Sequence, residues 1–552
     1  MKSAPFVLLL SCLAVASFAG AQQKPASTSP SADRKTETAV TASQPTERTE
    51  SRREESHAAA SEPARPGAEK IKWDMTEAAP VVTHHEIKVN GKLLKYTATA
   101  GRMPIKDIGG TTEALMFYVA YTLDGAEPGT RPVTFAFNGG PGSASLWLHM
   151  GCLGPRKVVL QPEGWMPAAP YRLTDNAYTP LDRTDLVLID AIGTGWSRPA
   201  DLDKGKKFWG VKGDIEAFGE FIRMYITRNE RWSSPLYLLG ESYGTTRAAG
   251  VSGYLTDKGI VFNGVTLLSE VLDFQTLLFS RRNDEPYYLI LPTYSMIAAY
   301  HKKLAPELSA DLPRLRAEVE NWVWSVYVPL LEKGDAMTAN ERQTVIDGLA
   351  KYTGLKRDVI DQENLRIDVR AFTTNLLADQ KLRVGRLDGR YTGPDPTPGP
   401  SGRGGGGFTD PTSSQTGPPF TAVFNDYVRR ELNYKTDLPY YVSAQDAGLG
   451  PEAFRWDWGS AGEGYADTAT PLRSAIAKNP FLKVMVMEGY YDLATPYFAA
   501  NYTMDHLALL PEYRKNISFV TYEAGHMMYV QTDSLAKVKK DLVNFIDSSL
   551  PK

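Results

Sequence analysis

The sequence predicts an α/β protein: a mostly parallel central sheet with helices on both faces and a helical cap inserted between two parts of the core. Three observations lead to this class. Short, nearly continuous apolar runs recur along the chain, which is typical of strands buried on both faces of a parallel sheet. Segments with helical periodicity separate or follow these runs, and one long stretch without apolar strands interrupts the rhythm.

The N-terminal residues 1–21 have the pattern of a secretory signal peptide. Lys2 precedes an apolar run that ends in small residues, so we expect cleavage after Ala21 and a secreted or periplasmic protein. The run is short for a membrane-spanning helix. A lipoprotein cleavage site at Cys12 is the alternative, and a lipid on that cysteine is the one membrane attachment that the sequence suggests.

The next segment, residues 22–70, is rich in Ser, Thr, Ala, Pro, Glu and Arg and has almost no large apolar side chains. Such a segment cannot bury enough surface to offset the entropy of ordering. We therefore expect it to be a disordered tether.

Residues 71–279 are expected to form the first part of the core. Apolar and polar residues alternate on both sides of Asn90-Gly91, which predicts a hairpin, and the strand pattern continues over 113–123. Further strands are expected at 132–138, 185–190, 235–240 and 264–271, and helices at 213–228 and 245–256.

Residues 280–440 contain helical patterns and no convincing apolar strand, so we expect a helical insertion that caps the sheet. Within it, the Gly- and Pro-rich stretch 393–419 is expected to be a flexible loop. Residues 441–552 then complete the core. Strands are expected there at 482–489 and 517–525, and helices at 497–509 and 533–549.

Composition and motif spacing argue against several classes of partner. The 552-residue chain has 61 basic and 64 acidic residues, a formal net charge of -3, which gives no reason to expect nucleic acid. No histidine or cysteine group has metal-ligand spacing, and the glycine-rich loop at 139–142 lacks the lysine of a phosphate-binding loop, so no metal or cofactor is expected. Cys152 lies among apolar and glycine residues, which favours a buried structural thiol over a nucleophile.

Ser242 is the candidate nucleophile. It stands in a complete G-x-S-x-G pattern, Gly240-Glu241-Ser242-Tyr243-Gly244, between a predicted buried strand and a predicted helix. In that context small residues on both sides let the serine occupy a strained turn with its hydroxyl exposed above the sheet. An ordinary strand-to-helix turn is the alternative.

His526 is the histidine best placed to act as the base, because it follows an apolar strand and a glycine, before the last helix. Asp492, just after another predicted strand, is the candidate orienting acid; Glu488 and Asp505 are its competitors. The chain order Ser242, Asp492, His526 is that of the α/β-hydrolases. The other histidines are expected to be surface, core or tether residues: His57, His84, His85, His149, His301 and His506.

A tetrahedral intermediate needs backbone donors, and the loop after the strand at 132–138 can supply one. Glycines there have no side chain to obstruct the approach of an oxyanion. We assign the oxyanion hole to the amides of Gly140 and Tyr243, the residue after the nucleophile.

Several segments of the chain resemble the serine carboxypeptidases. The segments that carry the likeness are "NGGPGSAS" (138–145), "DAIGTGWS" (190–197), "GESYG" (240–244), "GYYDLATP" (489–496) and "AGHM" (524–527). The resemblance implies an α/β-hydrolase fold with a helical cap, and release of the C-terminal residue from peptides or proteins.

The resemblance also implies that Asn138, Gly139 and Glu241 bind the terminal carboxylate of the substrate. A glutamate can bind a carboxylate only if one of the two carries a proton, which a desolvated pocket favours by raising the pKa of Glu241. The chain departs from the family in three ways. It has "MGCLGP" where an acidic partner for that glutamate often stands, no proline after Asp190, and too few cysteines for disulfides, which suits a bacterial periplasmic form.

The expected function is a serine carboxypeptidase that works through Ser242, Asp492 and His526. The same triad acting on esters, or transferring an acyl group to an alcohol, is the main alternative. A further alternative is a binding protein with a catalytically inactive hydrolase domain. The presence of all three triad members argues against it.

Overall fold

The computed structural model describes residues 71–394, 410–447, 454–459 and 464–550. The expected signal peptide with its cleavage site at Ala21, the alternative lipid site at Cys12 and the expected tether 22–70 lie outside these residues. So does the segment 395–409 of the expected flexible loop. None of the helices in the described ranges combines the length and hydropathy that a bilayer-spanning segment needs.

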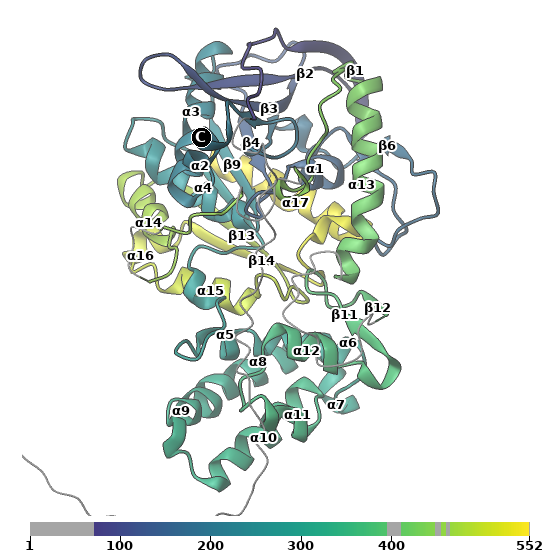
Figure 1. Ribbon diagram of the computed structural model, residues 1–552, viewed down its shortest axis with the longest axis vertical. Coiled ribbons are helices and arrows are strands. Elements are labelled where there is room, and N and C mark those ends of the chain that lie inside the picture. The colour runs from purple at the N-terminus through teal and green to yellow at the C-terminus, as the bar shows by residue number, and fades with distance from the viewer. Residues whose placement is uncertain (1–70, 395–409, 448–453, 460–463, 551–552) are drawn as a thin grey trace, which may run out of the picture. The chain divides into compact units, whose positions relative to one another are not determined.

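The centre of the fold is a ten-stranded sheet with the order β1-β2-β3-β7-β4-β9-β10-β13-β14, in which β8 pairs with β3 (Figure 1). The strands are β1 (Val81–Val89), β2 (Lys92–Lys106), β3 (Thr112–Leu123), β4 (Val133–Phe137), β7 (Asp185–Ile189), β8 (Arg198–Pro199), β9 (Leu236–Glu241), β10 (Gly264–Leu268), β13 (Lys483–Gly489) and β14 (Ile517–Tyr522). The run from β7 to β14 is parallel, and β1, β2 and β3 join it antiparallel. The mostly parallel sheet predicted from the apolar runs is confirmed.

Local sequence explains the two kinds of strand. In the hairpin between β1 and β2, Asn90 and Gly91 have φ angles of 49° and 78°, the left-handed pair that a tight two-residue turn requires. In the middle of the sheet, every residue of β4, β7, β9 and β10 is buried. These strands therefore need apolar side chains on both faces.

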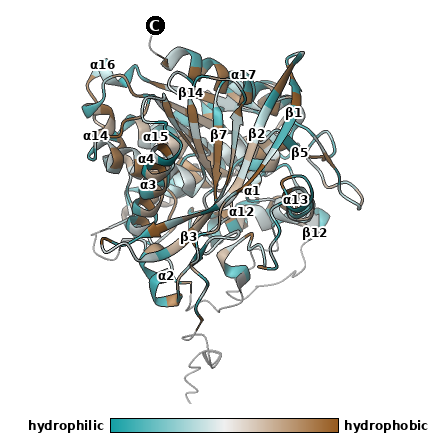
Figure 2. Cartoon of the chain, turned by 90° about the horizontal axis from the view of Figure 1, so that it is seen from above, coloured by the Kyte–Doolittle hydropathy of each residue, from teal (hydrophilic) through white to brown (hydrophobic). Residues whose placement is uncertain are grey.

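Helices cover both faces of the sheet, as Figure 2 shows in a view from above. One face packs against α3 (Val211–Arg228), α4 (Tyr243–Thr256), α14 (Ala469–Lys478) and α15 (Tyr497–Asp505). The other packs against α17 (Thr532–Ser549) and α13 (Pro411–Arg430). The catalytic candidates all follow the carboxyl ends of strands that these two layers enclose.

The cap has a hydrophobic core of its own. Its helices are α5 (Glu285–Leu289), α6 (Leu291–Tyr300), α7 (Pro306–Ser309), α8 (Leu312–Trp322), α9 (Val328–Leu331), α10 (Ala339–Thr353), α11 (Arg357–Gln362) and α12 (Val369–Asn375). A short antiparallel pair, β11 (Leu382–Val384) and β12 (Thr392–Pro394), follows them, so the expectation of an insertion without strands was wrong in this detail.

The expected flexible loop 393–419 is corrected at both ends, because β12 extends to Pro394 and α13 begins at Pro411. The Asp410 side chain accepts a hydrogen bond from the Thr412 amide at 2.7 Å, and a proline suits the first helical position, where no amide donor is needed. Phe420, Phe424 and other residues of the same helix bury their side chains in the core beside the sheet. This tertiary packing outweighs the turn-forming composition of the segment.

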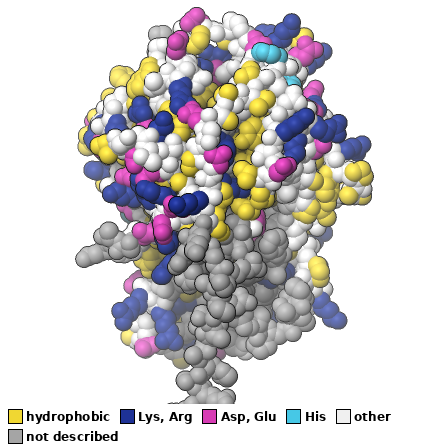
Figure 3. All heavy atoms as spheres, turned by 45° about the horizontal axis from the view of Figure 1, so that its top comes forward, with side chains coloured by type: hydrophobic (Ala, Val, Ile, Leu, Met, Phe, Trp, Pro, Cys, Tyr) yellow, Lys and Arg dark blue, Asp and Glu magenta, His cyan; other side chains and the backbone are white. Residues whose placement is uncertain are grey.

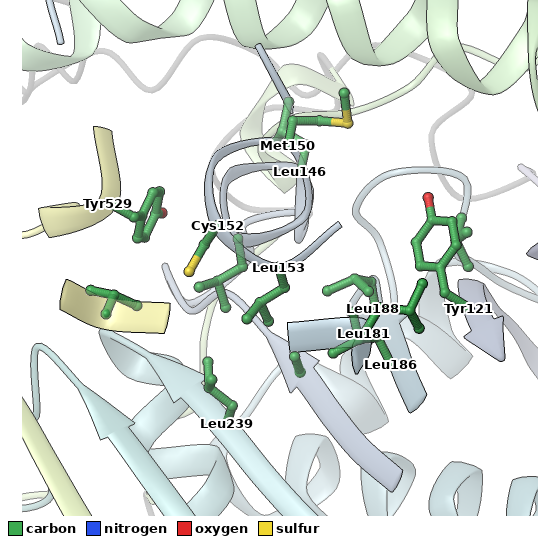
Figure 4. Packing of buried hydrophobic residues seen from close by; sticks show 14 of the residues in the cluster. Tyr121, Leu146, Met150, Cys152, Leu153, Leu181, Leu186, Leu188, Leu239 and Tyr529 are labelled. Atoms are coloured by element: carbon green, nitrogen blue, oxygen red, sulfur yellow. The ribbon is translucent and has the colours of Figure 1, made fainter. Parts of the chain in front are cut away.

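Cys152 belongs to that core. It lies in a π-helical turn, His149–Leu153, that continues the short helix α1 (Leu146–Leu148). Figure 4 shows it in the same packed cluster as Leu153 and Tyr529, and burial raises the pKa of the thiol far above its usual value. The prediction of a structural thiol is confirmed. On the face shown in Figure 3, basic and acidic side chains are intermixed rather than gathered by sign.

Candidate active site

Ser242 stands at a sharp turn between β9 and α4. Its backbone has φ 60° and ψ -133°, a strained conformation that residues other than glycine rarely adopt. The two flanking glycines are required by space. A Cβ on Gly240 would lie 2.0 Å from the Gly244 carbonyl oxygen, and one on Gly244 would lie 2.7 Å from that of Phe137. The backbone is therefore bent as the motif predicts, and the ordinary turn is ruled out.

The loop after β4 runs directly beside this turn, because β4 and β9 are neighbours and Phe137 pairs with Gly240. A Cβ on Gly139 would lie 2.4 Å from the Tyr243 nitrogen, so only glycine allows the loop to approach so closely. Tyr243 is the first residue of α4, and a first-turn amide has no acceptor inside its own helix. Gly140, with φ 108°, lies in a turn that the Ser143 amide closes by donating to the Gly139 carbonyl at 3.0 Å.

Asn138 is held at three points. Its side-chain oxygen accepts a hydrogen bond from the Leu148 amide at 2.9 Å, which leaves the amide nitrogen to face Glu241. Its carbonyl oxygen accepts one from the buried Arg247 guanidinium at 2.6 Å, and Arg247 is paired with Asp214 of α3. The orientation of this asparagine is thus fixed by contacts with α1 and with α4.

The segment 190–197 supports the glycine loop from the opposite side. Asp190 accepts a hydrogen bond from the Ser145 amide at 2.7 Å, and Gly195 lies so close to its carboxyl group that a Cβ there would be 1.8 Å from Oδ2. Burial raises the pKa of Asp190 to about 7. This segment therefore supports the loop, and none of its residues lines the cavity beside Ser242.

His526 and Asp492 lie on the loops that follow β14 and β13. Nδ1 of His526 is 2.7 Å from Oδ2 of Asp492, and Asp492 is almost fully buried. The remaining acceptor sites of Asp492 are filled by the Ala494 and Thr495 amides and by the Thr495 hydroxyl, at 2.8, 3.1 and 2.7 Å. The imidazole can then present Nε2 to a reacting group. Thr495 is a part of this site that sequence reasoning missed.

The pKa of His526 is raised above its ordinary value. Burial, the largest influence, lowers it, but the charge of Asp492 and the hydrogen bond to that carboxylate outweigh burial, and the charge of Glu241 adds to them. A base whose protonated form is stabilised by a buried carboxylate suits proton transfer from a serine hydroxyl.

One cavity of about 290 Å³ brings the predicted residues together. Ser242 and His526 line it, as do the two oxyanion-hole candidates, Gly140 and Tyr243. The three carboxylate-binding candidates also line it: Asn138, Gly139 and Glu241. Asp492 does not line the cavity, and its carboxylate contacts Nδ1 of His526.

Glu241 is buried at the floor of this cavity. Its Oε2 accepts a hydrogen bond from the Tyr529 hydroxyl at 2.7 Å, and Asn138 contacts the same carboxyl group. Burial raises the pKa of Glu241 to about 7, although the positive charge of His526 and these hydrogen bonds act in the opposite direction. Tyr529 fills the place for which the sequence offered no acidic partner.

A short segment of the cap insertion, residues 386–389, holds both catalytic loops. The His526 amide donates to the Leu387 carbonyl at 2.7 Å, and the Gly525 amide donates to the Asp388 carboxylate at 3.1 Å. On the other side, the Leu493 amide donates to the Arg386 carbonyl at 3.0 Å. We name this segment the strap. No sequence motif pointed to it.

The competing candidates have other partners. Glu488 is buried and accepts a hydrogen bond from Thr521 at 3.3 Å, and Asp505 forms an ion pair with Arg514. His149 is a core residue, 2.6 Å from the Tyr121 hydroxyl, and burial lowers its pKa to about 3.

The strand order, the bent serine backbone and the His526–Asp492 pair define a hydrolase of the α/β-hydrolase type. A family model described as serine carboxypeptidase matches residues 94–257, so the resemblance predicted from the motifs is confirmed over that part of the chain. The match includes Asn138, Glu241 and Ser242 and ends before Asp492 and His526. A comparison with curated protein sequences gave no match.

Solved structures with some similarity include three hydrolases. A proline iminopeptidase from Mycobacterium smegmatis is 13% identical over 82% of this chain and 98% of its own, with a TM-score of 0.34. A putative aryl esterase from Burkholderia cenocepacia (12%, covering 82% and 100%) has a TM-score of 0.31, and a carboxyl esterase from Bacillus coagulans (12%, covering 81% and 98%) one of 0.32. At such scores these likenesses carry no argument about activity.

Proposed function

We propose that this protein is a serine carboxypeptidase, which hydrolyses the last peptide bond of peptides and proteins. The observation that carries the proposal is the position of Glu241. Its buried carboxyl group shares one cavity with the Ser242 hydroxyl and has a pKa of about 7. An ester or amide without a terminal carboxylate would have no use for a protonated acid held there.

In the proposed mechanism, His526 takes the Ser242 proton as the hydroxyl oxygen attacks the scissile carbonyl carbon. Asp492 keeps the ring in one orientation and stabilises the imidazolium that forms. The amides of Gly140 and Tyr243 donate to the oxyanion. His526 then protonates the leaving amine, and a water molecule that His526 deprotonates releases the acyl group from Ser242.

The released residue is recognised by its free carboxylate. Protonated Glu241 donates a hydrogen bond to one oxygen of that group, and the Asn138 amide and the Gly139 backbone provide the others. Tyr529 and Leu148 hold Glu241 and Asn138 in place, because the Tyr529 hydroxyl donates to Glu241 Oε2 and the Leu148 amide donates to Asn138 Oδ1.

A matched pair of substrates tests the proposal: an N-blocked dipeptide with a free C-terminus and the same dipeptide as its C-terminal amide. A site built to hydrogen-bond a group rejects the analogue that lacks it, so we expect kcat/KM to favour the free acid by about 100-fold or more. Glu241→Ala should reduce this ratio strongly while the enzyme still hydrolyses a simple ester.

Equal cleavage of the acid and the amide would overturn the carboxypeptidase proposal. If simple esters are then the better substrates, the same triad serves an esterase, which is the alternative that the sequence left open.

A further inference from the structure

A second cavity, of about 420 Å³, adjoins the one that contains Ser242. Five residues line both cavities, and we call them the shared wall: Gly140, Phe274, Leu277, Arg386 and Ala494. Arg386 is the only charged residue in this wall. A substrate that extends from one cavity into the other therefore passes Arg386.

In the proposed binding mode, the second cavity receives the acyl side of the substrate. Asn138, Gly139 and Glu241, which are proposed to bind the terminal carboxylate, line the first cavity and not the second. The released residue therefore occupies the part of the first cavity near Asn138, Gly139 and Glu241. The part of the peptide that stays on Ser242 must extend away from these three residues. The shared wall lies along that path.

The backbone of Arg386 is fixed on both sides. Its amide donates to the Asp410 carboxylate at 2.7 Å, and its carbonyl accepts from the Leu493 amide. The side chain is exposed, and its charge is close enough to His526 to act on that residue, lowering its pKa against the larger effects of burial and of Asp492. The backbone contacts thus fix the point from which the Arg386 side chain extends, and its charge acts on the catalytic base.

Nearby acidic groups have other roles. Asp388 is paired with Arg390, and Asp410 accepts from the amides of Arg386 and Thr412. In the second cavity, Asp368 accepts from the Ala371 amide at 2.7 Å as the cap of α12. Within the described ranges, the ion pairs therefore leave the Arg386 guanidinium without a carboxylate partner.

The rest of the second cavity is mostly apolar and carries one more cation. Leu278, Phe279, Ile290, Val369 and Leu493 are among its lining residues, together with Arg370 and Asp368. The charge of Arg386 thus lies beside an apolar surface. That combination favours a substrate segment with an apolar body and a negative charge.

We propose, on the basis of the carboxypeptidase function proposed above, that Arg386 selects peptides with an acidic side chain just before the released residue. The guanidinium binds the carboxylate of an Asp or Glu at one of the two positions that precede the released residue. The apolar wall contacts the remaining side chains. Arg386 is therefore a specificity-determining residue for the acyl part of the substrate.

The test uses N-blocked tripeptides that differ only by Glu or Gln, placed at either of the two positions before the C-terminal residue. For the wild-type enzyme we expect kcat/KM to be about tenfold higher for the Glu peptide at one of these positions. Arg386→Gln should bring that ratio to about one, and Arg386→Glu should invert it. Lys381→Gln removes an exposed positive charge from the same region, outside both cavities, and should leave the ratio unchanged.

A wild-type ratio of one at both positions, or a preference that survives Arg386→Gln, would overturn the inference. So would an equal loss of preference in the Lys381→Gln control, because the effect would then be one of general charge. Equal thermal unfolding temperatures of the variants would show that folding is not the cause of any change.

The 4-nitrophenyl esters of the same blocked acyl groups separate this inference from the proposed function, because they have no terminal carboxylate. A Glu preference on esters that disappears in Arg386→Gln, without cleavage of peptides, would support the role of Arg386 and reject the carboxypeptidase. Peptide cleavage without a Glu preference would reject the role of Arg386 alone. No turnover of either class would reject both.

Discussion

The two halves of the catalytic site are built in different ways. On the nucleophile side, the loops after β4 and β9 are fixed by their own glycines, by neighbouring strands and by the segment 190–197, so the core around the sheet determines their geometry. On the base side, β13 and β14 are also neighbours, but the loops that carry Asp492 and His526 are held by the strap from the cap insertion. The nucleophile thus depends on the core around the sheet, and the base depends in addition on a segment of the cap insertion.

The largest expected effect tests whether the two halves act as one unit. Ser242→Ala and His526→Ala should each lower kcat by about 10⁴-fold or more, and the double variant should be no worse than the more damaging single one. Pre-steady-state and steady-state assays on one ester substrate would measure this. Additive losses in the double variant would show that the two residues act independently.

Gly139→Ala is expected to damage the nucleophile side. The new Cβ would lie 2.4 Å from the Tyr243 nitrogen and 2.5 Å from the Gly244 nitrogen, so the loop must move away from the oxyanion site. Loss of an oxyanion-hole donor costs about 10²- to 10³-fold in kcat. Gly417→Ala, where a Cβ meets nothing within 4 Å, is the matched control and should keep full activity. Unchanged kcat in Gly139→Ala would contradict the assigned oxyanion hole.

Asp388→Ala is expected to loosen the base side. The change removes the acceptor of the Gly525 amide and the ion-pair partner of Arg390, so His526 should sample more orientations. We expect kcat to fall about tenfold with little change in KM, because Asp388 holds the loop of the base and lines neither cavity. Asp379→Ala, which breaks an exposed ion pair with Lys303 on the same insertion, should change neither constant. A change in KM alone would place Asp388 in substrate binding instead.

The smallest effect concerns pH. Glu241 must be protonated to bind a carboxylate, and its pKa is about 7, so kcat/KM for free-acid peptides should fall as the pH rises through 7. Glu241→Gln stays neutral and should abolish this fall. It also removes a charge that raises the pKa of His526, so the fall in activity at acidic pH should move to lower pH. The same alkaline decline in both enzymes would show that another group titrates.

Sequence patterns were sufficient to predict the parts of the fold that depend on nearby residues in the chain. The strands of the sheet and the bent backbone at Ser242 followed from apolar runs and from two flanking glycines. The start of α13 was missed because its first turn has a turn-forming composition, and only packing against the sheet explains it. Tyr529, Thr495 and the strap were missed because their contacts join residues far apart in the chain or lack a motif.

Labelling with a serine-directed phosphonylating reagent, followed by peptide mapping, tests most directly whether the two halves meet. We predict that the label appears on Ser242, that its rate falls at least about 10³-fold in His526→Ala, and that Asp388→Ala gives an intermediate rate. Label on another residue, or an unchanged labelling rate at Ser242 without the imidazole, would contradict the account.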